Sequence, residues 1–240
     1  RDSISTKEFN KLTDQSGVGY YVAFSIIYTY FALTEFYLNS NLQLNSWFND
    51  LKDTLLIFSI FVSLFLLRDL FSSKNLPGIL VKKYFRFIFY ITSSFVFIYL
   101  IANLKGFYDP SIILGCFILI WVNDSFAYIV GKSFGKQKLF YSISPHKTVE
   151  GFLGGLLFCC ISASIVSRYI DETLTTPNWL IIAIIVSVFG TLGDLIESKL
   201  KRESNVKDSG KIIPGHGGIL DRLDSIIFAS PYIYLFLKLI

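Results

Sequence analysis

The sequence predicts an all-α polytopic membrane protein, because its apolar residues form long runs and its few charged residues are clustered between them. Hydrophobic residues make up 52% of the 240 residues and charged residues 17%, and the mean hydropathy is +0.54. Soluble domains carry about 25% charged residues, so this chain is depleted in charge. Apolar runs of about 20 residues are long enough to cross a bilayer as helices.

Seven apolar runs meet or approach the length of a membrane span. The seventh is short, and we expect its helix to start a few residues earlier. The expected spans are Tyr20–Leu38, Thr54–Leu70, Tyr84–Leu104, Ser111–Val130, Phe152–Ile170, Trp179–Ile196 and Ile226–Ile240. Aromatic residues near span ends, including Tyr108 and Trp179, are typical of the belt at a membrane surface.

The basic residues alternate between the two sides that these spans define. Of the 22 Lys and Arg residues, 18 fall on the side of the N-terminal arm, and only Lys52, Lys105, Arg168 and Lys238 fall on the other. Cytoplasmic loops of membrane proteins are enriched in Lys and Arg. We therefore expect the N-terminus and the loops after the second, fourth and sixth spans to face the cytoplasm. Short loops suit a bacterial inner membrane.

The remaining composition predicts one integral membrane domain without a structural zinc site. Residues 1–122 are expected to form N-terminal transmembrane helices, and residues 123–240 a catalytic transmembrane region. The three cysteines lie in apolar runs, without a CxxC or Cys/His cluster, so buried thiols are expected. The chain begins at Arg1 with a polar stretch, so we expect no signal peptide there and further residues upstream.

A first group of polar residues follows the fourth span. Asp124 lies near the end of that span, where it is either hydrated at the membrane surface or part of a polar pocket. Gly131 and Gly135 alternate with lysines, which favours phosphate, although no Walker A motif is present. Thr148 and Glu150 then precede a glycine-rich helix start.

A second group surrounds the end of the sixth span. Asp194 and Glu197 are three residues apart and share a helix face, and Asp221 and Asp224 repeat that spacing before the last span. Carboxylates converging from two helix ends are suited to Mg²⁺. Alternatively, the acids at 221 and 224 only stabilise a helix start.

Basic residues and a glycine turn lie between these two acidic pairs. Acids for a metal, cations for polyphosphate and a glycine turn for close backbone approach together predict phosphoryl or nucleotidyl transfer. The residues concerned are Lys199, Lys201, Arg202, Lys207, Lys211 and Pro214–Gly218.

These residues resemble the signature of the CDP-diacylglycerol synthases, or phosphatidate cytidylyltransferases. Its pattern, SxxKRx₄KDxxxxxPGHGGxxDRxD, matches Ser198–Asp224 without a departure. Asp124–Tyr128 and Ser144–Gly151 are similar to another family motif, except that His146 stands where Lys or Asn is usual. Family members usually have eight or nine spans, against seven here.

The resemblance implies transfer of CMP from CTP to phosphatidic acid, giving CDP-diacylglycerol and pyrophosphate with one or two Mg²⁺ ions. It implies Asp194, Asp221 and Asp224 as metal ligands, and these three with Lys201 as catalytic residues. The residues it implies for binding CTP or the lipid phosphate are Asp124, Lys147, Ser198, Arg202, Lys207, Asp208, Lys211, His216, Gly217, Gly218 and Arg222. Family members tend to dimerise, so a homodimer through small residues such as Gly154 and Gly155 is a further expectation.

Two other classes of protein fit parts of the sequence. A CTP-dependent polyprenol or phytol kinase would make CDP rather than pyrophosphate, and an archaeal-type lipid cytidylyltransferase would use another lipid. A transporter would place charged residues deep in several spans and show inverted repeats. No repeat is visible here, and the charges gather on one side, so the transporter is the remote alternative. Nothing in the chain indicates nucleic-acid binding.

Overall fold

The computed structural model describes residues 29, 45–71, 87–104, 107–170, 173–203, 206, 208–210 and 218–240. Helices dominate this part of the chain, as the sequence predicts. In chain order the elements are α3 (Asn45–Phe71), the π-helical η1 (Phe87–Thr92), α6 (Ser93–Ala102), α7 (Ser111–Phe134), β1 (Lys138–Phe140), β2 (Ser144–Thr148), α8 (Val149–Tyr169), α9 (Thr176–Glu203), the 3₁₀ turn η2 (Leu220–Arg222) and α10 (Asp224–Leu239).

Four of these helices, α3, α7, α8 and α9, are long and apolar enough to cross a membrane. This confirms the predicted class of an all-α membrane protein. Part of the third expected span forms η1 and α6, and the last forms α10, which starts two residues before Ile226. These helices are shorter than the four candidate spans, so the count of seven spans stays a prediction. The first expected span, Tyr20–Leu38, lies outside the described residues except for Thr29.

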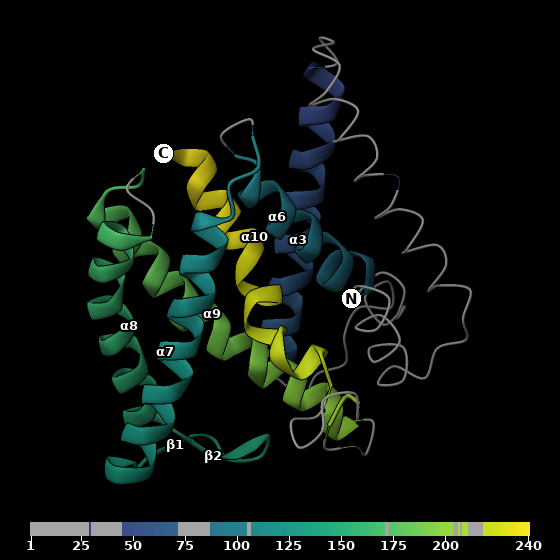
Figure 1. Cartoon of the computed structure of the whole chain (residues 1–240). Coiled ribbons are helices and arrows are strands. Elements are labelled where there is room, and N and C mark those ends of the chain that lie inside the picture. The colour runs from purple at the N-terminus through teal and green to yellow at the C-terminus, as the bar shows by residue number, and fades with distance from the viewer. Residues whose placement is uncertain are drawn as a thin grey trace.

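Helices α7, α8 and α9 pack against one another, and α10 packs along α9 (Figure 1). Gly155 lets α8 approach α7 closely, because a Cβ there would lie 2.7 Å from the carbonyl oxygen of Asn123. A Cβ at Gly154 would meet Val130 of the same helix α7 at 2.6 Å. Both glycines therefore serve packing inside the chain, and a dimer contact through them stays a prediction.

The main core lies where α6, α7, α8, α9 and α10 meet. Trp179, Leu119 and Ile182 are fully buried in it. The expectation that Trp179 lies in the aromatic belt is wrong, since its ring fills the space beside Gly115 and Val166. Tyr108 is exposed, as a belt residue would be.

Two short strands interrupt the helical pattern between α7 and α8. β1 and β2 pair antiparallel, with Lys138 opposite Thr148 and Phe140 opposite Ser144. The sequence predicts only a loop here. The hairpin lies at the same end of the bundle as the last turns of α7 and α9 and the first turns of α8 and α10, whereas the C-terminus lies at the other end (Figure 1).

Candidate active site

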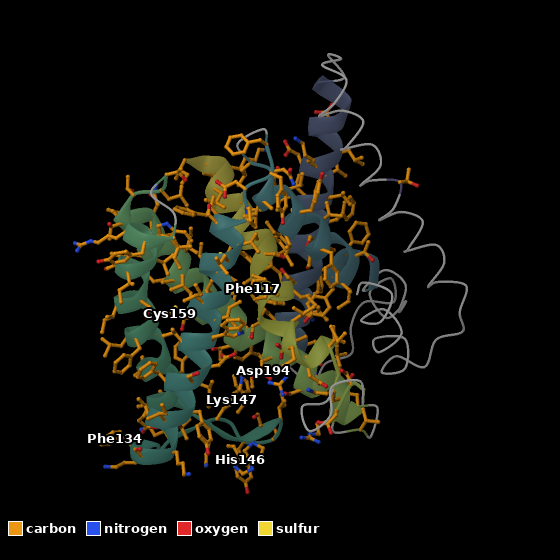
Figure 2. All side chains as sticks on the ribbon, in the orientation of Figure 1. Phe117, Phe134, His146, Lys147, Cys159 and Asp194 are labelled. Carbon is orange, nitrogen blue, oxygen red and sulfur yellow. The ribbon has the colours of Figure 1, made fainter. Side chains whose placement is uncertain are left out.

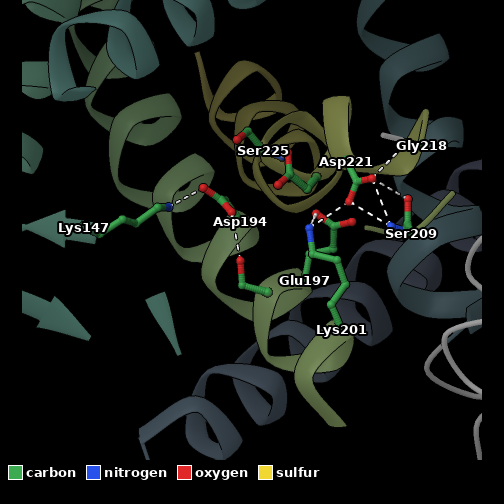
Figure 3. Close-up of polar contacts among 10 residues, drawn as sticks. Lys147, Asp194, Glu197, Lys201, Ser209, Gly218, Asp221 and Ser225 are labelled. Carbon is green, nitrogen blue, oxygen red and sulfur yellow. Dashed lines mark hydrogen bonds and ion pairs between the residues drawn. The ribbon is translucent and has the colours of Figure 1, made fainter. Parts of the chain in front are cut away.

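The last turns of α9 present a row of polar side chains to this end of the bundle. Glu197, Ser198 and Lys201 lie three, four and seven residues after Asp194, so the four residues line one side of the helix. Ser198 Oγ donates to Asp194 Oδ1 at 3.2 Å. Helix α9 therefore brings these four polar side chains close together (Figure 3).

The hairpin brings Lys147 onto this row. Successive side chains of a strand point to opposite faces, so Lys147 and His146 point in different directions. Lys147 forms an ion pair with Asp194, while His146 is exposed and points away from the bundle (Figure 2). Lys147 and Asp194 are about a third exposed, at 27% and 36% of their side chains, so a bound anion could reach this pair.

The hairpin is held in place by the start of α8. Thr148 Oγ1 accepts a hydrogen bond from the backbone N–H of Gly151, which makes Thr148 the N-cap of that helix. The carboxylate of Glu150 accepts from the backbone N–H groups of Lys136 and Gln137 at 3.0 and 3.1 Å. The backbone is thus fixed on both sides of Lys147, at Lys136 and Gln137 before it and at the start of α8 after it.

Asp221 is the centre of a second set of contacts. Its carboxylate accepts from Lys201 Nζ at 2.8 Å, from Ser209 N and Oγ at 3.0 and 2.9 Å, and from Gly218 N at 2.7 Å. Burial raises the pKa of Asp221, but the hydrogen bonds from Lys201 and Gly218 outweigh it and lower the pKa to about 2. In this conformation Asp221 anchors the chain on both sides of the glycine turn to α9 (Figure 3).

Glu197 and Asp224 form a buried acidic pair between these two sets. Their side chains are adjacent, and the residues are 2% and 8% exposed. Asp224 Oδ1 accepts from the N–H of Ser225 at 2.7 Å. Lys201 Nζ lies 3.4 Å from Glu197 Oε2, but neither Glu197 oxygen has a hydrogen-bond partner within the described part of the chain. Buried carboxylate oxygens of this kind are suited to a cation.

Further charged residues surround this pair. Asp124 is an exposed residue of α7, ten residues before the end of that helix, and lies within electrostatic range of Asp194, Lys147 and Arg222. Arg202, Asp208 and Arg222 are also exposed at this end. Asp124 therefore lies near the charged residues of this end of the bundle, and its place in a polar pocket stays a prediction.

The three predicted metal ligands do not converge on one common position in this structure. Among the residues it describes, no group of three or more His, Cys, Asp or Glu side chains is arranged to hold a metal ion. Asp194 and Asp224 interact electrostatically, whereas Asp221 connects to them through Lys201 and Glu197. Four predicted binding residues, Lys207, Lys211, His216 and Gly217, lie outside the described residues.

The sequence does not indicate the role of Ser209 in this site. Ser209 is fully buried and gives Asp221 two hydrogen bonds, yet a serine in a polar loop carries no signal of that role. The spacing of Glu197 places it among the acids suited to Mg²⁺, but the resemblance does not imply it as a metal ligand. Its signal was its position, three residues after Asp194 near the end of an apolar helix.

Lys199 attaches the end of α9 to the neighbouring helix α3. Its Nζ donates to the backbone oxygen and to Oδ2 of Asp69, at 2.6 and 2.7 Å. Asp69 lies in the last turn of α3, so this contact also places a positive charge at the negative end of that helix. The basic end of α9 is therefore fixed to α3.

Chemically, the arrangement offers cations for phosphate beside carboxylates for a metal. Lys147 is accessible at one edge, Arg202 and Arg222 are exposed, and Glu197 and Asp224 supply buried oxygens between them. Such a combination is suited to charge neutralisation in transfer of a phosphate-containing group.

Comparisons with known proteins point to the same chemistry. A sequence model of the cytidylyltransferase family matches residues 2–240. The phosphatidate cytidylyltransferase of Staphylococcus saprophyticus is 42% identical over 195 residues, which cover 80% of this chain and 72% of that protein. The phosphatidate cytidylyltransferase of Bacillus subtilis is 48% identical over 150 residues, or 62% of this chain and 55% of that protein.

The match thus spans about half of the Bacillus relative and a larger share of the Staphylococcus one. The family model, in contrast, covers nearly the whole of this sequence, including the hairpin, the end of α9 and the start of α10. The chain belongs to the cytidylyltransferase family.

Proposed function

We propose that this protein transfers CMP from CTP to phosphatidic acid, producing CDP-diacylglycerol and pyrophosphate for phospholipid synthesis. The observation that carries the proposal is the match to the cytidylyltransferase family over residues 2–240, together with relatives named phosphatidate cytidylyltransferase. The site supports it, because its cations and carboxylates meet at one end of membrane-spanning helices. A charged nucleotide and a lipid headgroup can both reach such a place.

In the proposed reaction, a phosphate oxygen of phosphatidic acid forms a bond to the α-phosphorus of CTP. The bond from that phosphorus to the β-phosphate breaks, and pyrophosphate leaves with the electron pair. The nucleophile is already anionic near neutral pH, so positioning and charge neutralisation supply most of the rate. Lys147, Arg202 and Arg222 are placed to hold the phosphates, as are Lys207 and Lys211 by sequence.

Mg²⁺ is the proposed cofactor, in one or two ions, with Asp194, Asp221 and Asp224 as its ligands. Two features favour a cation there: the buried acids Glu197 and Asp224 are adjacent, and Glu197 has no hydrogen-bond partner among the described residues. A bound Mg²⁺ would neutralise phosphate charge as pyrophosphate leaves. In this conformation the Asp221 carboxylate accepts hydrogen bonds from Lys201, Ser209 and Gly218, so it acts as a structural anchor here rather than as a metal ligand.

The roles of the remaining residues follow from their place. Lys201 pairs with both Glu197 and Asp221 and so offsets part of the negative charge of the site. Ser198 orients Asp194 through its hydroxyl. Asp124, Asp208, His216, Gly217 and Gly218 complete the proposed binding set for nucleotide and lipid.

The topology of the protein is also part of the proposal. Seven spans, with the active site in the cytoplasm of a bacterial cell, agree with the alternation of 18 and 4 basic residues between the two sides. A cysteine introduced for Ser142, an exposed residue of the hairpin turn, tests this. In sealed cells it should resist a membrane-impermeant thiol reagent, and in inverted vesicles it should react. The reverse pattern would contradict the orientation. A homodimer stays a prediction.

Asp194→Asn in reconstituted vesicles tests the site assignment. We expect loss of CDP-diacylglycerol formation to below about a tenth of wild type, because the change removes a charge at the proposed metal and phosphate site. Asp53→Asn is the matched control, since Asp53 lies at the opposite end in an exposed pair with Lys238. Chelation of Mg²⁺ should stop the wild-type reaction reversibly. Turnover that survives both treatments would contradict the proposed site and its metal.

A further inference from the structure

The end of α7, the segment that joins it to β1, and the hairpin carry exposed basic and aromatic residues that the proposed reaction does not use. We define the basic hairpin surface as Lys132, Phe134, Lys136, Lys138 and Tyr141. All five are exposed, and the rings of Phe134 and Tyr141 are 68% and 73% accessible. Exposed aromatic rings among lysines are characteristic of protein surfaces at a membrane interface.

The length of α7 places this surface at the depth of the lipid headgroups. The helix has 24 residues and is therefore about 36 Å long, against a hydrocarbon thickness of about 30 Å. Lys132 lies 21 residues after Ser111, about 31 Å along the axis. Its ammonium lies 5.7 Å from the centre of the Tyr128 ring, and Tyr128 is itself exposed. An interfacial tyrosine and a lysine at this depth mark the boundary of the hydrocarbon.

The exposed face of α7 leads from this boundary towards the middle of the bilayer. Trp121, Tyr128 and Lys132 are seven and four residues apart, so they lie on the same side of the helix. Trp121 is 64% exposed and lies about 16 Å below Lys132 along the axis. A phospholipid whose headgroup contacts Lys132 would therefore lay its acyl chains beside Trp121.

The charge of the surface selects the kind of lipid. Within the described residues, none of the three lysines forms an ion pair with a carboxylate, and the nearby Glu150 is bound to backbone N–H groups. These hydrogen bonds of Glu150 fix the backbone at Lys136, so the lysines project from an ordered segment of the chain. Glu150 interacts electrostatically with Lys136, but the three lysines leave this surface with a net positive charge. Such a charge at headgroup depth attracts phosphate-bearing, anionic headgroups.

We infer that the basic hairpin surface is a docking site for anionic phospholipid, separate from the site that performs the reaction. Lys147 of the hairpin pairs with Asp194, whereas the residues of the basic hairpin surface are exposed to solvent. Figure 2 shows Phe134, His146 and Lys147 at the same end of the bundle. An anionic lipid concentrated here would lie at the same end of the bundle as the proposed active site. The inference rests on the membrane helices and the charges of the hairpin, and holds whatever reaction the protein performs.

Quenching of Trp121 by brominated lipids tests the docking site without any turnover. The protein is reconstituted in mixtures of phosphatidylcholine and phosphatidylglycerol, with bromine on the chains of one lipid at a time. A Trp121→Phe variant supplies the signal of the other tryptophans, which is subtracted. We expect phosphatidylglycerol to be preferred over phosphatidylcholine beside Trp121 by at least about fivefold, the contribution of about one interfacial lysine. The preference should decline at high salt.

Charge variants assign the preference to this surface. Changing Lys132, Lys136 and Lys138 together to Gln should reduce the preference to less than about twofold, whereas changing them together to Arg should retain it. Lys238→Gln, at the other end of the bundle, should leave it unchanged. Thermal stability in detergent shows that each variant is folded. Equal quenching by the two lipids in wild type, or an undiminished preference in the triple Gln variant, would overturn the inference.

Discussion

Asp221→Asn and Asp194→Asn should both stop the reaction but differ in their effect on stability. Asp221 accepts four hydrogen bonds, from Lys201, Ser209 and Gly218, and its side chain is only 10% exposed. Asparagine keeps one acceptor oxygen but loses the charge that pairs with Lys201. Asp194 is 36% exposed and has one ion pair and one hydrogen bond from a side chain. The two substitutions therefore remove very different amounts of interaction.

The expected loss in the free energy of unfolding follows from these contacts. A hydrogen bond to a charged group contributes about 1.5–3 kcal/mol, and breaking one partner of a buried pair costs about 3–5 kcal/mol. Because Asp221 is slightly exposed, we expect the lower value, about 3 kcal/mol, which corresponds to a fall in Tm of about 6–12 °C for a chain of this size. For Asp194→Asn we expect less than about 1 kcal/mol, since partly exposed pairs contribute little.

The assay is the fraction of protein that stays monodisperse in detergent after heating, measured in parallel with product formation. Asp53→Asn is the control, because it removes a carboxylate from an exposed pair with Lys238 and should alter neither property. Equal Tm values for Asp221→Asn and wild type would refute the role of Asp221 as an anchor. An equal loss in Asp194→Asn would refute the separation of the two roles.

Three further outcomes follow from the geometry of the site. Lys147→Gln should reduce turnover by about ten- to a hundredfold, the contribution of one charge-assisted contact, and Lys147→Arg should restore part of it; equal rates for both variants would contradict a role for the charge. Gly193→Ala should destabilise the protein by about 1–3 kcal/mol, because its Cβ would lie 2.6 Å from Phe228 Cβ, whereas Gly190→Ala, whose Cβ has 3.4 Å of room, should be tolerated; thermal unfolding of the pair checks this. The pKa of Asp221 is lowered to about 2, so its stabilising contribution is complete above its unfolded-state value near 4 and is lost only as the pH falls below that. The Tm difference between wild type and Asp221→Asn should therefore be constant from about pH 5 to 8, and a strong slope there would argue against this assignment.

The helices could be predicted from the sequence because a bilayer imposes a length and a polarity on each span. Asp194 and Glu197 were placed on one helix face by their spacing alone, and the structure confirms that face. The same local reasoning placed the start of the last helix before Ile226, where it is observed at Asp224.

The hairpin and the anchor at Asp221 could not be predicted in this way. The strands Lys138–Phe140 and Ser144–Thr148 are short, and Pro145 and the polar residues around it are typical of loops. Their pairing is stabilised by contacts such as that of Glu150 with the N–H of Lys136. Lys201 and Asp221 are 20 residues apart, and their contact depends on how the intervening chain returns to α9. Such non-local contacts leave no periodic signal in the sequence.

The position of the label after incubation with two forms of radioactive CTP tests the proposed function most directly. The purified protein is given phosphatidic acid and Mg²⁺ with CTP labelled on either the α- or the γ-phosphate. The account predicts that α-label enters the lipid as CDP-diacylglycerol and that γ-label leaves as pyrophosphate. Transfer of γ-label to the lipid, with release of CDP, would show a kinase and contradict the account.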